Sequence, residues 1–459
     1  MRKPLTALLV FCACALAEEP QAAAIRNARI VTVGGPVISK GTVVIRNGLI
    51  EAVGESVPIP ADAWIVEGEG MTVYPGLIDA LSTVGMPGAT PATAGRGGRG
   101  QTTPATPAVA STTTAAAAPA RGPEDRPNTT SWVLAADEIQ ATDRRIETVR
   151  SAGFTTTVTY PTRGIFAGQG SIVDLVSTER SGDMVVAPAV GQYISFTRTG
   201  GGGGFGSFPS ALMGYIAYVR QIYLDAEHYK LVKEAYARDP RSVERPAYDR
   251  ALEGVLASKR ILLPANRLVE MDRMLRFAAE LKQPAILYGM REGYRPEAAP
   301  LLKKYGAPVL VSLRWSEAAR DPDPEAVESM RNLLNIDQGP ATPALLEKAG
   351  VAFALYTDGI DQPREFARAV RKAIDGGLSR EAAIRALTLS PAEIYGVADR
   401  MGSIAAGKIA NLVVTKGDLF DANTRIQMIF VDGKQYKPAP ETPPGGGRGQ
   451  ATEEPGVNR

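Results

Sequence analysis

Few side chains in this sequence are able to act as nucleophiles, acid–base groups or metal ligands, and the nitrogen and sulfur donors are the scarcest. The 459 residues contain one histidine, His228, and two cysteines, Cys12 and Cys14. Both cysteines lie in an N-terminal segment that we expect to be removed. The mature chain would then have no thiol for catalysis, for a disulfide or for a metal. His228 lies in a charged segment that is typical of a solvated helix face.

Carboxylates are the remaining candidates for acid–base or metal chemistry. Asp358 follows the apolar run Val351–Tyr356, which predicts a strand. At this position just past a strand end, Asp358 has two possible roles. It would act as a catalytic general base, which contributes on the order of 10²–10⁴-fold in rate, or it would be kept only for its hydrogen bonds. Asp358, Asp361 and Glu292 would also offer oxygen ligands to a hard cation, although their spacing matches no known motif. Asp79, in contrast, is expected to tie its strand to neighbouring strands.

Alternating strands and helices are predicted to position these side chains. Short β-rich runs such as Ala285–Tyr288 alternate with amphipathic segments such as Glu297–Tyr305 from residue 135 onward. A later helix is predicted to start at Ser390-Pro391-Ala392-Glu393, which has the pattern of a capping box. Repeated βα units favour a parallel sheet, so residues 76–398 are predicted to form an α/β (β/α)₈ TIM-type barrel, with functional side chains at one end.

Segments at both ends of the chain predict a second, smaller domain. Residues 22–75 and 399–437 are rich in short β runs. Asn47-Gly48, between two such runs, is a strong hairpin signal because both turn positions need positive φ. We therefore expect a β-sandwich built from both termini.

Three segments are expected to lie outside these domains. Residues 1–17 have two basic residues, a short apolar run and a cleavage site after Ala17, which predict a signal peptide and a secreted or periplasmic protein. A lipoprotein acylated at Cys14 is the weaker alternative. Residues 85–130 are mostly Gly, Ala, Thr and Pro, which predicts a disordered insertion or, because it follows the first barrel strand, a lid. Residues 438–459 are predicted to be a disordered tail.

Composition excludes some classes of partner. The chain is 44% apolar and 22% charged, with a formal net charge of +2, as in an ordinary globular protein. Such a charge balance gives no reason to expect a nucleic acid partner, and it leaves a small-molecule ligand as the simplest expectation. No apolar segment is long enough to predict a membrane span.

Several motifs resemble those of one family. Pro75-Gly76-Leu77-Ile78-Asp79 is similar to the segment with which metal-dependent amidohydrolases enter their barrel, where the next residues read x-His-x-His. Ala152-Gly153-Phe154-Thr155-Thr156 resembles a strand of that family, and residues 165–170 (IFAGQG) are similar to a Gly-Gln-Gly loop of one subgroup. Residues 401–414 (MGSIAAGKIANLVV) resemble its closing segment. The chain thus resembles the amidohydrolase superfamily, in particular imidazolonepropionase-like and related secreted members.

The resemblance implies a metal centre that this sequence does not reproduce. The family uses zinc or another divalent metal, held by four histidines and an aspartate at the C-terminal mouth of the barrel. The four histidine positions correspond here to Leu81, Thr83, Pro264 and Tyr288. Asp358 matches the final aspartate. We therefore predict no metal cofactor and regard the four positions as vestigial.

Three residues are candidates for substrate binding. The resemblance places Gln169 in the Gly-Gln-Gly loop. Tyr288 and Arg291 would line a remodelled pocket for an anionic or aromatic ligand, or would simply pack and be solvated.

Three functional hypotheses follow from this pattern. The favoured one is a non-catalytic ligand-binding or partner subunit, which forms a homo-oligomer or pairs with an active paralogue. The alternative is an active hydrolase of C–N bonds (amide, cyclic amide or dipeptide) with a non-standard or metal-free site. A structural scaffold without a ligand is the third.

Overall fold

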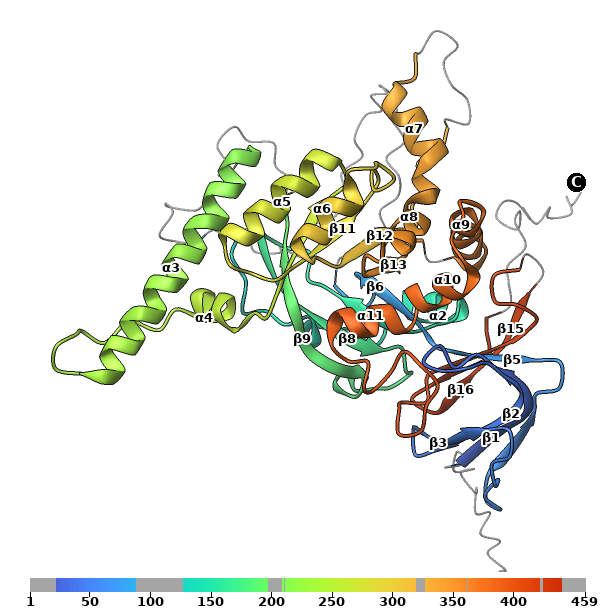
Figure 1. The fold of residues 1–459 in the computed structure, drawn as a ribbon. Helices are drawn as coiled ribbons and strands as arrows, with labels where there is room; N and C mark the ends of the chain where they lie inside the picture. Colours follow the sequence, from blue (N-terminus) through green and yellow to red (C-terminus); the bar gives the residue numbers. More distant parts are fainter. Residues whose placement is uncertain are drawn as a thin grey trace, which may run out of the picture.

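The computed structural model describes residues 22–87, 126, 128–196, 209, 211–318, 327–360, 362–421 and 424–439. Residues 1–17, most of the segment 85–130 and most of the segment 438–459 lie outside these ranges, as does Asp361. The described residues form two eight-stranded sheets, with most of the helices packed around one of them (Figure 1).

The larger part of the molecule is a nearly closed barrel. Its strands follow one another in chain order around the sheet: β6 (Leu77–Ser82), β7 (Phe154–Thr159), β8 (Phe166–Asp174), β9 (Val185–Ile194), β10 (Ile261–Ala265), β11 (Ala285–Gly289), β12 (Val309–Ser312) and β13 (Phe353–Tyr356). Apolar side chains such as Ile78, Val158, Leu262 and Leu310 pack together in one buried cluster. The predicted class, an α/β TIM-type barrel with a separate β domain, is confirmed.

Strand β8 departs from the predicted run of parallel βα units. It is antiparallel to both of its neighbours, β7 and β9, whereas β6–β7 and all pairs from β9 to β13 are parallel. The connections before and after β8 are too short for the helical crossover that a parallel strand requires. The segment IFAGQG, expected as a loop, is the start of this strand, so that prediction is wrong.

Close packing explains the glycines of β8. A Cβ atom on Gly170 would lie 2.2 Å from Cε1 of Tyr160, and one on Gly168 would lie 2.6 Å from the carbonyl oxygen of Val133. The glycines therefore let neighbouring groups approach the strand, which offsets their low strand propensity.

Asp79 closes the barrel between β13 and β6, where the two strands have no mutual backbone ladder. Its carboxylate is fully buried and accepts the backbone N–H of Thr357 at 2.9 Å and the Thr357 hydroxyl at 2.7 Å. The N–H of Ile78 donates to the carbonyl of Leu387. This confirms the prediction that Asp79 ties its strand to its neighbours.

The smaller domain combines both ends of the chain. Its sheet contains β1 (Ala22–Ile30), β2 (Ile38–Arg46), β3 (Leu49–Gly54), β4 (Trp64–Glu67), β5 (Thr72–Pro75), β14 (Leu412–Lys416), β15 (Arg425–Val431) and β16 (Lys434–Tyr436). Asn47 and Gly48 have φ of 51° and 78°, so the predicted hairpin turn between β2 and β3 is confirmed. Strand β5 runs directly into β6, which joins the domain to the barrel.

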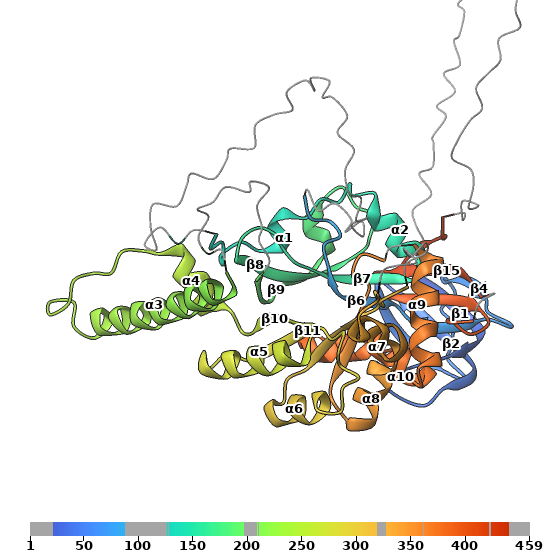
Figure 2. The same ribbon diagram turned by 90° about the horizontal axis from the view of Figure 1, so that it is seen from above.

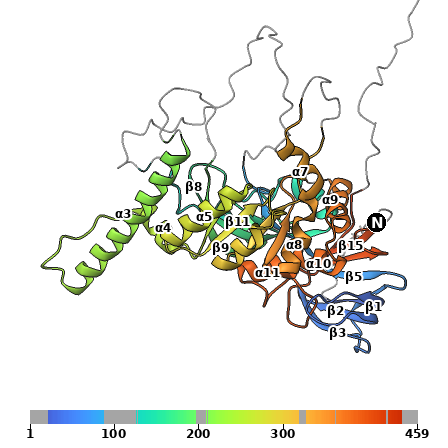
Figure 3. The same ribbon diagram turned by 45° about the horizontal axis from the view of Figure 1, so that its top comes forward.

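Eleven helices occur among the described residues. They are α1 (Ala135–Glu138), α2 (Arg145–Ser151), α3 (Leu212–Arg238), α4 (Arg250–Ala257), α5 (Leu268–Glu280), α6 (Ala298–Tyr305), α7 (Met330–Gln338), α8 (Thr342–Ala349), α9 (Pro363–Asp375), α10 (Arg380–Ala386) and α11 (Leu389–Tyr395). The long helix α3 projects at the end of the molecule opposite to the β domain, as Figures 2 and 3 show. None of the helices in the described ranges is long and apolar enough to cross a membrane.

The predicted capping box at Ser390 is wrong. Helix α11 begins at Leu389, with Thr388 as its N-cap. The Glu393 side chain does not turn back to the helix start but accepts two hydrogen bonds from Arg385. The Glu393 side chain therefore forms an ion pair with Arg385 of α10 in place of the predicted capping contact.

Candidate functional site

Polar and aromatic side chains gather where the strands β9 to β13 end. They are Tyr193, Tyr288, Ser312, Tyr356 and Asp358, and we call them the tyrosine–aspartate cluster. The rings of Tyr193 and Tyr288 stack with centroids 5.5 Å apart, and the hydroxyl of Tyr288 donates to that of Tyr193 at 2.9 Å. The ring of Tyr160 also packs against that of Tyr193, at 5.6 Å between ring centroids. Functional residues of TIM-type barrels lie at this end of the strands.

Asp358 is held in place by the loops that follow two strands. It adopts φ of 52°, which is unfavourable for a residue with a side chain. The hydroxyl of Ser312 donates to its carboxylate oxygen Oδ2 at 2.8 Å, and Nε of Arg314 donates to its backbone carbonyl at 2.9 Å. A strained backbone fixed by such contacts is common at functional sites.

The carboxylate of Asp358 is partly exposed and has no ion-pair partner among the described residues. Arg314 contacts the backbone of Asp358, and no ion pair of its guanidinium with the carboxylate is formed. The structure thus presents a negative charge that protein cations do not neutralise.

The tyrosines of the cluster are neutral hydroxyl groups near pH 7. Burial raises the pKa of Tyr193, and the charge of Asp358 adds to this effect. The pKa values of Tyr288 and Tyr356 lie well above 10, again mainly because of burial, with smaller contributions that include the charge of Asp358. Each of these side chains therefore offers an apolar ring and an uncharged hydroxyl group.

The four positions that the resemblance aligns with histidines have separate structural surroundings. Leu81 packs against the apolar cluster inside the barrel. Pro264 lies opposite Tyr288 in the register of β10 and β11, so the third and fourth positions are side by side.

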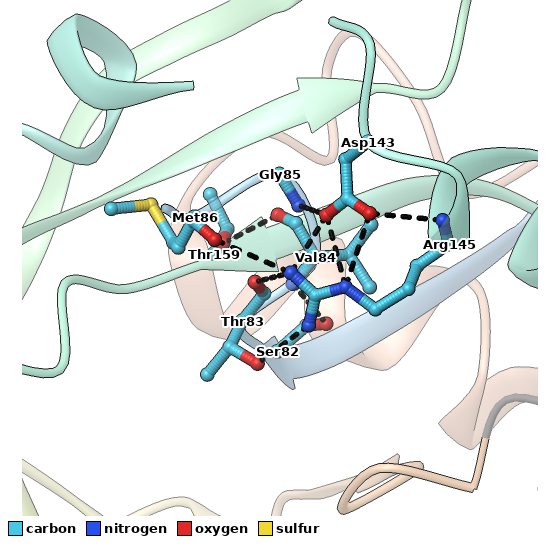
Figure 4. A network of polar contacts seen from close by, with 8 residues as sticks. All are labelled: Ser82, Thr83, Val84, Gly85, Met86, Asp143, Arg145 and Thr159. Carbon is cyan, nitrogen blue, oxygen red and sulfur yellow. Dashed lines mark hydrogen bonds and ion pairs between the residues drawn. The ribbon is translucent and has the colours of Figure 1, made fainter. Parts of the chain in front are cut away.

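Thr83 belongs to a bonded loop at the end of β6, which Figure 4 shows. The guanidinium of Arg145 donates to the Thr83 hydroxyl at 3.3 Å and to its carbonyl at 2.9 Å, while Asp143 accepts from Arg145 and from the N–H of Gly85. No local pattern singles out Asp143 and Arg145, because their partners lie about 60 residues away along the chain.

Among the described residues, no hydrogen bond, ion pair or ring contact links the other predicted site residues to the tyrosine–aspartate cluster. Gln169 is buried and donates to the carbonyl of Gly254 in α4. Glu292 is buried, accepts from the N–H of Leu268 at the start of α5 and lies 3.4 Å from Nε of Arg331. Arg291 is exposed, and His228 is exposed on α3, as expected. The substrate-binding roles of Gln169 and Arg291 stay predictions. The cation site of Asp358, Asp361 and Glu292 also stays a prediction, because Asp361 lies outside the described residues.

The donors at this mouth do not fit a metal centre of the kind that the resemblance implies. In the described part of the chain, no three His, Cys, Asp or Glu side chains lie together so that they could hold a metal ion. Leu81 and Pro264 have no donor atom, and the Thr83 hydroxyl is bonded to Arg145. A phenol as weakly acidic as Tyr288 is also a poor ligand in neutral solution.

Comparison with known proteins shows a likeness to one family over part of the chain. Residues 327–437 match the model of the amidohydrolase family. An amidohydrolase from Thermotoga maritima MSB8 has the same fold, with a TM-score of 0.69 at 24% identity over 90% of this chain and 100% of the other. The motifs at residues 75–79 and 401–414 lie where the chain enters the barrel and where it returns to the β domain.

Two further proteins are similar over different extents. A stretch of 65 residues is 43% identical to the adenine deaminase of Moorella thermoacetica; it makes up 14% of this chain and 10% of the deaminase. A Xaa-Pro dipeptidase with bound methionine in the active site has a TM-score of 0.52 at 16% identity, over 91% of this chain and 100% of that one. At such identities the solved structures establish the fold alone.

Proposed function

We propose that this chain is an amidohydrolase-superfamily protein that has lost metal-dependent hydrolysis and serves as a ligand-binding or partner subunit. The observation that carries the proposal is the absence of histidine from all four positions of the family motif, in a chain whose single histidine, His228, lies exposed on α3. The poor fit of the neighbouring donors to a metal supports the same reading.

The energetic cost of such a loss supports the proposal. A metal lowers the pKa of bound water from 15.7 to about 7, which corresponds to roughly 12 kcal/mol. Asp358 acting alone as a general base would supply on the order of 10²–10⁴-fold in rate, which is far less. The inherited mechanism would therefore not operate at a useful rate.

Metal analysis and a hydrolysis screen test the proposal together. The mature protein is purified, its zinc and manganese content is measured, and amides, cyclic amides and dipeptides are assayed with and without added metal. We expect less than stoichiometric metal and no turnover above that of Asp358→Asn. Stoichiometric metal together with turnover that Asp358→Asn abolishes would disprove the proposal.

An active hydrolase of C–N bonds is the second candidate. The observation in its favour is the position of Asp358. Its carboxylate accepts a hydrogen bond from the hydroxyl of Ser312, and its charge contributes to the raised pKa of Tyr193. The names of the relatives, a deaminase and a dipeptidase, agree with such chemistry. Turnover that needs no metal and is lost in Asp358→Asn would establish it.

The proposal extends to location and assembly. Residues 1–17 would direct the chain out of the cytoplasm, which the N-terminus of the mature protein, read by mass spectrometry, would reveal. A partner subunit should form a homo-oligomer or bind an active paralogue, and light scattering of the purified protein distinguishes a dimer from a monomer.

A further inference from the structure

We infer that the tyrosine–aspartate cluster binds an organic ammonium ion, held against the exposed parts of Tyr193 and Tyr288 with its charge toward Asp358. This inference rests on the proposed function, because it names the class of ligand for the same site. It also differs from the anionic or aromatic ligand that the sequence suggested for Tyr288.

The first argument is the unbalanced charge. The carboxylate of Asp358 has one hydrogen bond, from Ser312, and no ion-pair partner in the described ranges. A carboxylate without a cationic partner favours a cation over an anion.

Two cationic side chains at this end of the barrel, Arg314 and Arg145, are engaged with other groups. Arg314 donates to the backbone carbonyl of Asp358, and Arg145 donates to Thr83, Met86 and Asp143. Arg291 is exposed. None of these groups forms an ion pair with the Asp358 carboxylate, so the charge of a ligand would have little competition there.

The second argument is the aromatic wall. Tyr193 and Tyr288 stack on each other with ring centroids 5.5 Å apart, and the buried ring of Tyr160 packs against Tyr193 at 5.6 Å. Tyr193 and Tyr288 are partly exposed, so a ligand can reach them. Aromatic rings attract cations.

The hydrogen bonds of the cluster leave suitable groups free for a ligand. Tyr288 uses its hydroxyl proton on the Tyr193 oxygen, and Ser312 uses its proton on Oδ2 of Asp358. The Oδ1 atom of Asp358 then remains an acceptor for an N–H group or a partner for a methylated ammonium. A neutral molecule of the same shape would gain the apolar contacts and lose the charge interaction.

A matched set of small probes tests the inference on the full mature chain. Calorimetry measures the binding of choline, of its neutral carbon isostere 3,3-dimethylbutan-1-ol, and of benzylammonium against benzyl alcohol and benzoate. We expect each ammonium probe to bind at least about tenfold more tightly than its neutral isostere, and benzoate to bind most weakly. Equal affinity for charged and neutral probes, or no binding of either ammonium probe, would overturn the inference.

Variants separate the charge from the ring. Asp358→Asn keeps the shape and the bond from Ser312, and it should abolish the preference for ammonium over the neutral isostere. Tyr193→Leu removes a ring and should weaken both ammonium probes, whereas Tyr193→Phe keeps the ring and should weaken them much less. Asp183→Asn, an exposed acid outside the cluster, is the matched control, and thermal melting confirms that each variant is folded.

The two proposals fail in different ways. Metal-dependent turnover in the hydrolysis screen would refute the proposed function. Because choline and benzylammonium contain no amide bond, the protein would not hydrolyse them, and their affinities would still test the ammonium inference. A preference for benzoate would refute the ammonium inference and leave the loss of metal-dependent hydrolysis standing.

Discussion

The two ends of the barrel differ in how completely their polar groups are paired. At the N-terminal end, the buried carboxylate of Asp174 accepts from Thr156 at 2.7 Å and from Asn411 at 2.9 Å. Asn411 in turn accepts the N–H of Asp432, which joins the β domain to the barrel. At the C-terminal end, Asp358 has one bond from Ser312 and no cationic partner among the described residues. The carboxylate of Asp174 is thus bonded from two segments, whereas that of Asp358 has a single bond and is the one for which we propose a ligand.

A cavity of about 970 Å³ at the N-terminal end strengthens this contrast. It is bordered by β1, by the residues before β13 and by α10, and its lining includes two ion pairs. Arg380 contacts Asp418 at 2.6 Å, and Arg385 contacts Glu393 at 2.7 Å. A charged ligand there would have to break these pairs, so size alone does not make this cavity the better candidate.

The largest effect is expected from the closure of the barrel. Asp79→Ala leaves the N–H and the hydroxyl of Thr357 without their acceptor in a buried place. Unfilled buried donors cost about 1–3 kcal/mol each, so the free energy of unfolding should fall by about 2–5 kcal/mol in urea titration.

Asp79→Asn sharpens this test. The amide keeps an acceptor for the N–H of Thr357, so the loss should be smaller than for alanine. The exposed acid Asp62, which pairs with Arg46 at the surface, provides a control, and its replacement by alanine should change stability by less than about 1 kcal/mol. A stable Asp79→Ala variant would mean that other contacts close the barrel.

The packing of Gly170 against Tyr160 gives the second prediction. Gly170→Ala places a Cβ atom 2.2 Å from the ring, and overpacking of this kind costs about 1–3 kcal/mol. Gly182→Ala is the control, since a Cβ there meets nothing within 4 Å. Adding Tyr160→Leu should recover part of the loss in a thermal melt, and a failure to recover would exclude the ring as the cause.

The third prediction concerns pH and the paired end of the barrel. Burial raises the pKa of Asp174 to about 7, so the folded protein keeps a proton that the unfolded chain has already released. Stability contributed in this way is greatest near pH 4 and is lost as the pH rises toward 7. Asp174→Asn should flatten that decline by at most about 1.4 kcal/mol per pH unit, the limit for one proton.

Urea titrations at several pH values measure this slope. Asp183→Asn, an exposed acid, should leave it unchanged. Asp79 contributes in the same direction, with a pKa of about 6, so some slope should remain in the Asp174 variant. A wild-type protein whose stability rises from pH 4 to pH 7 would contradict the assignment of the two buried acids.

Much of the scaffold was predictable from sequence because its signals are local. The β-rich runs became β10 to β13, and Asn47-Gly48 formed its turn because that dipeptide accepts positive φ. Strand β8 was missed because its glycines look like a loop, and they are explained only by distant neighbours, the Tyr160 ring beside Gly170 and the Val133 carbonyl beside Gly168.

The candidate site was only partly predictable, because its contacts join distant strands. Asp358 and Tyr288 were recognised from the motifs around them. Tyr193, Ser312 and Tyr356 have no local signature, and their relation to Asp358 arises from the order of strands β9 to β13. The same holds for the bond between Arg145 and Thr83, which lie 62 residues apart.

The smallest effect is expected at Thr83, one of the vestigial positions. Thr83→Val keeps the shape and removes a hydroxyl that accepts one long bond of 3.3 Å from Arg145. Arg145 keeps its bonds to the Thr83 carbonyl and to Asp143, so the loss should stay below about 1 kcal/mol. Choline binding should be unchanged, because Thr83 is not part of the tyrosine–aspartate cluster.

Arg145→Met is the matched variant, since it removes the guanidinium that holds the whole loop. Hydrogen exchange of residues 82–86 should then rise clearly, whereas in Thr83→Val it should stay near that of the native protein. If Thr83 still served a metal centre, its replacement would cause a large loss. Replacing even a residue that only contacts a metal ligand lowers metal affinity or activity 10–100-fold. If Thr83→Val impaired the protein more than Arg145→Met did, Thr83 would have a role beyond holding its loop, and the position would not be vestigial.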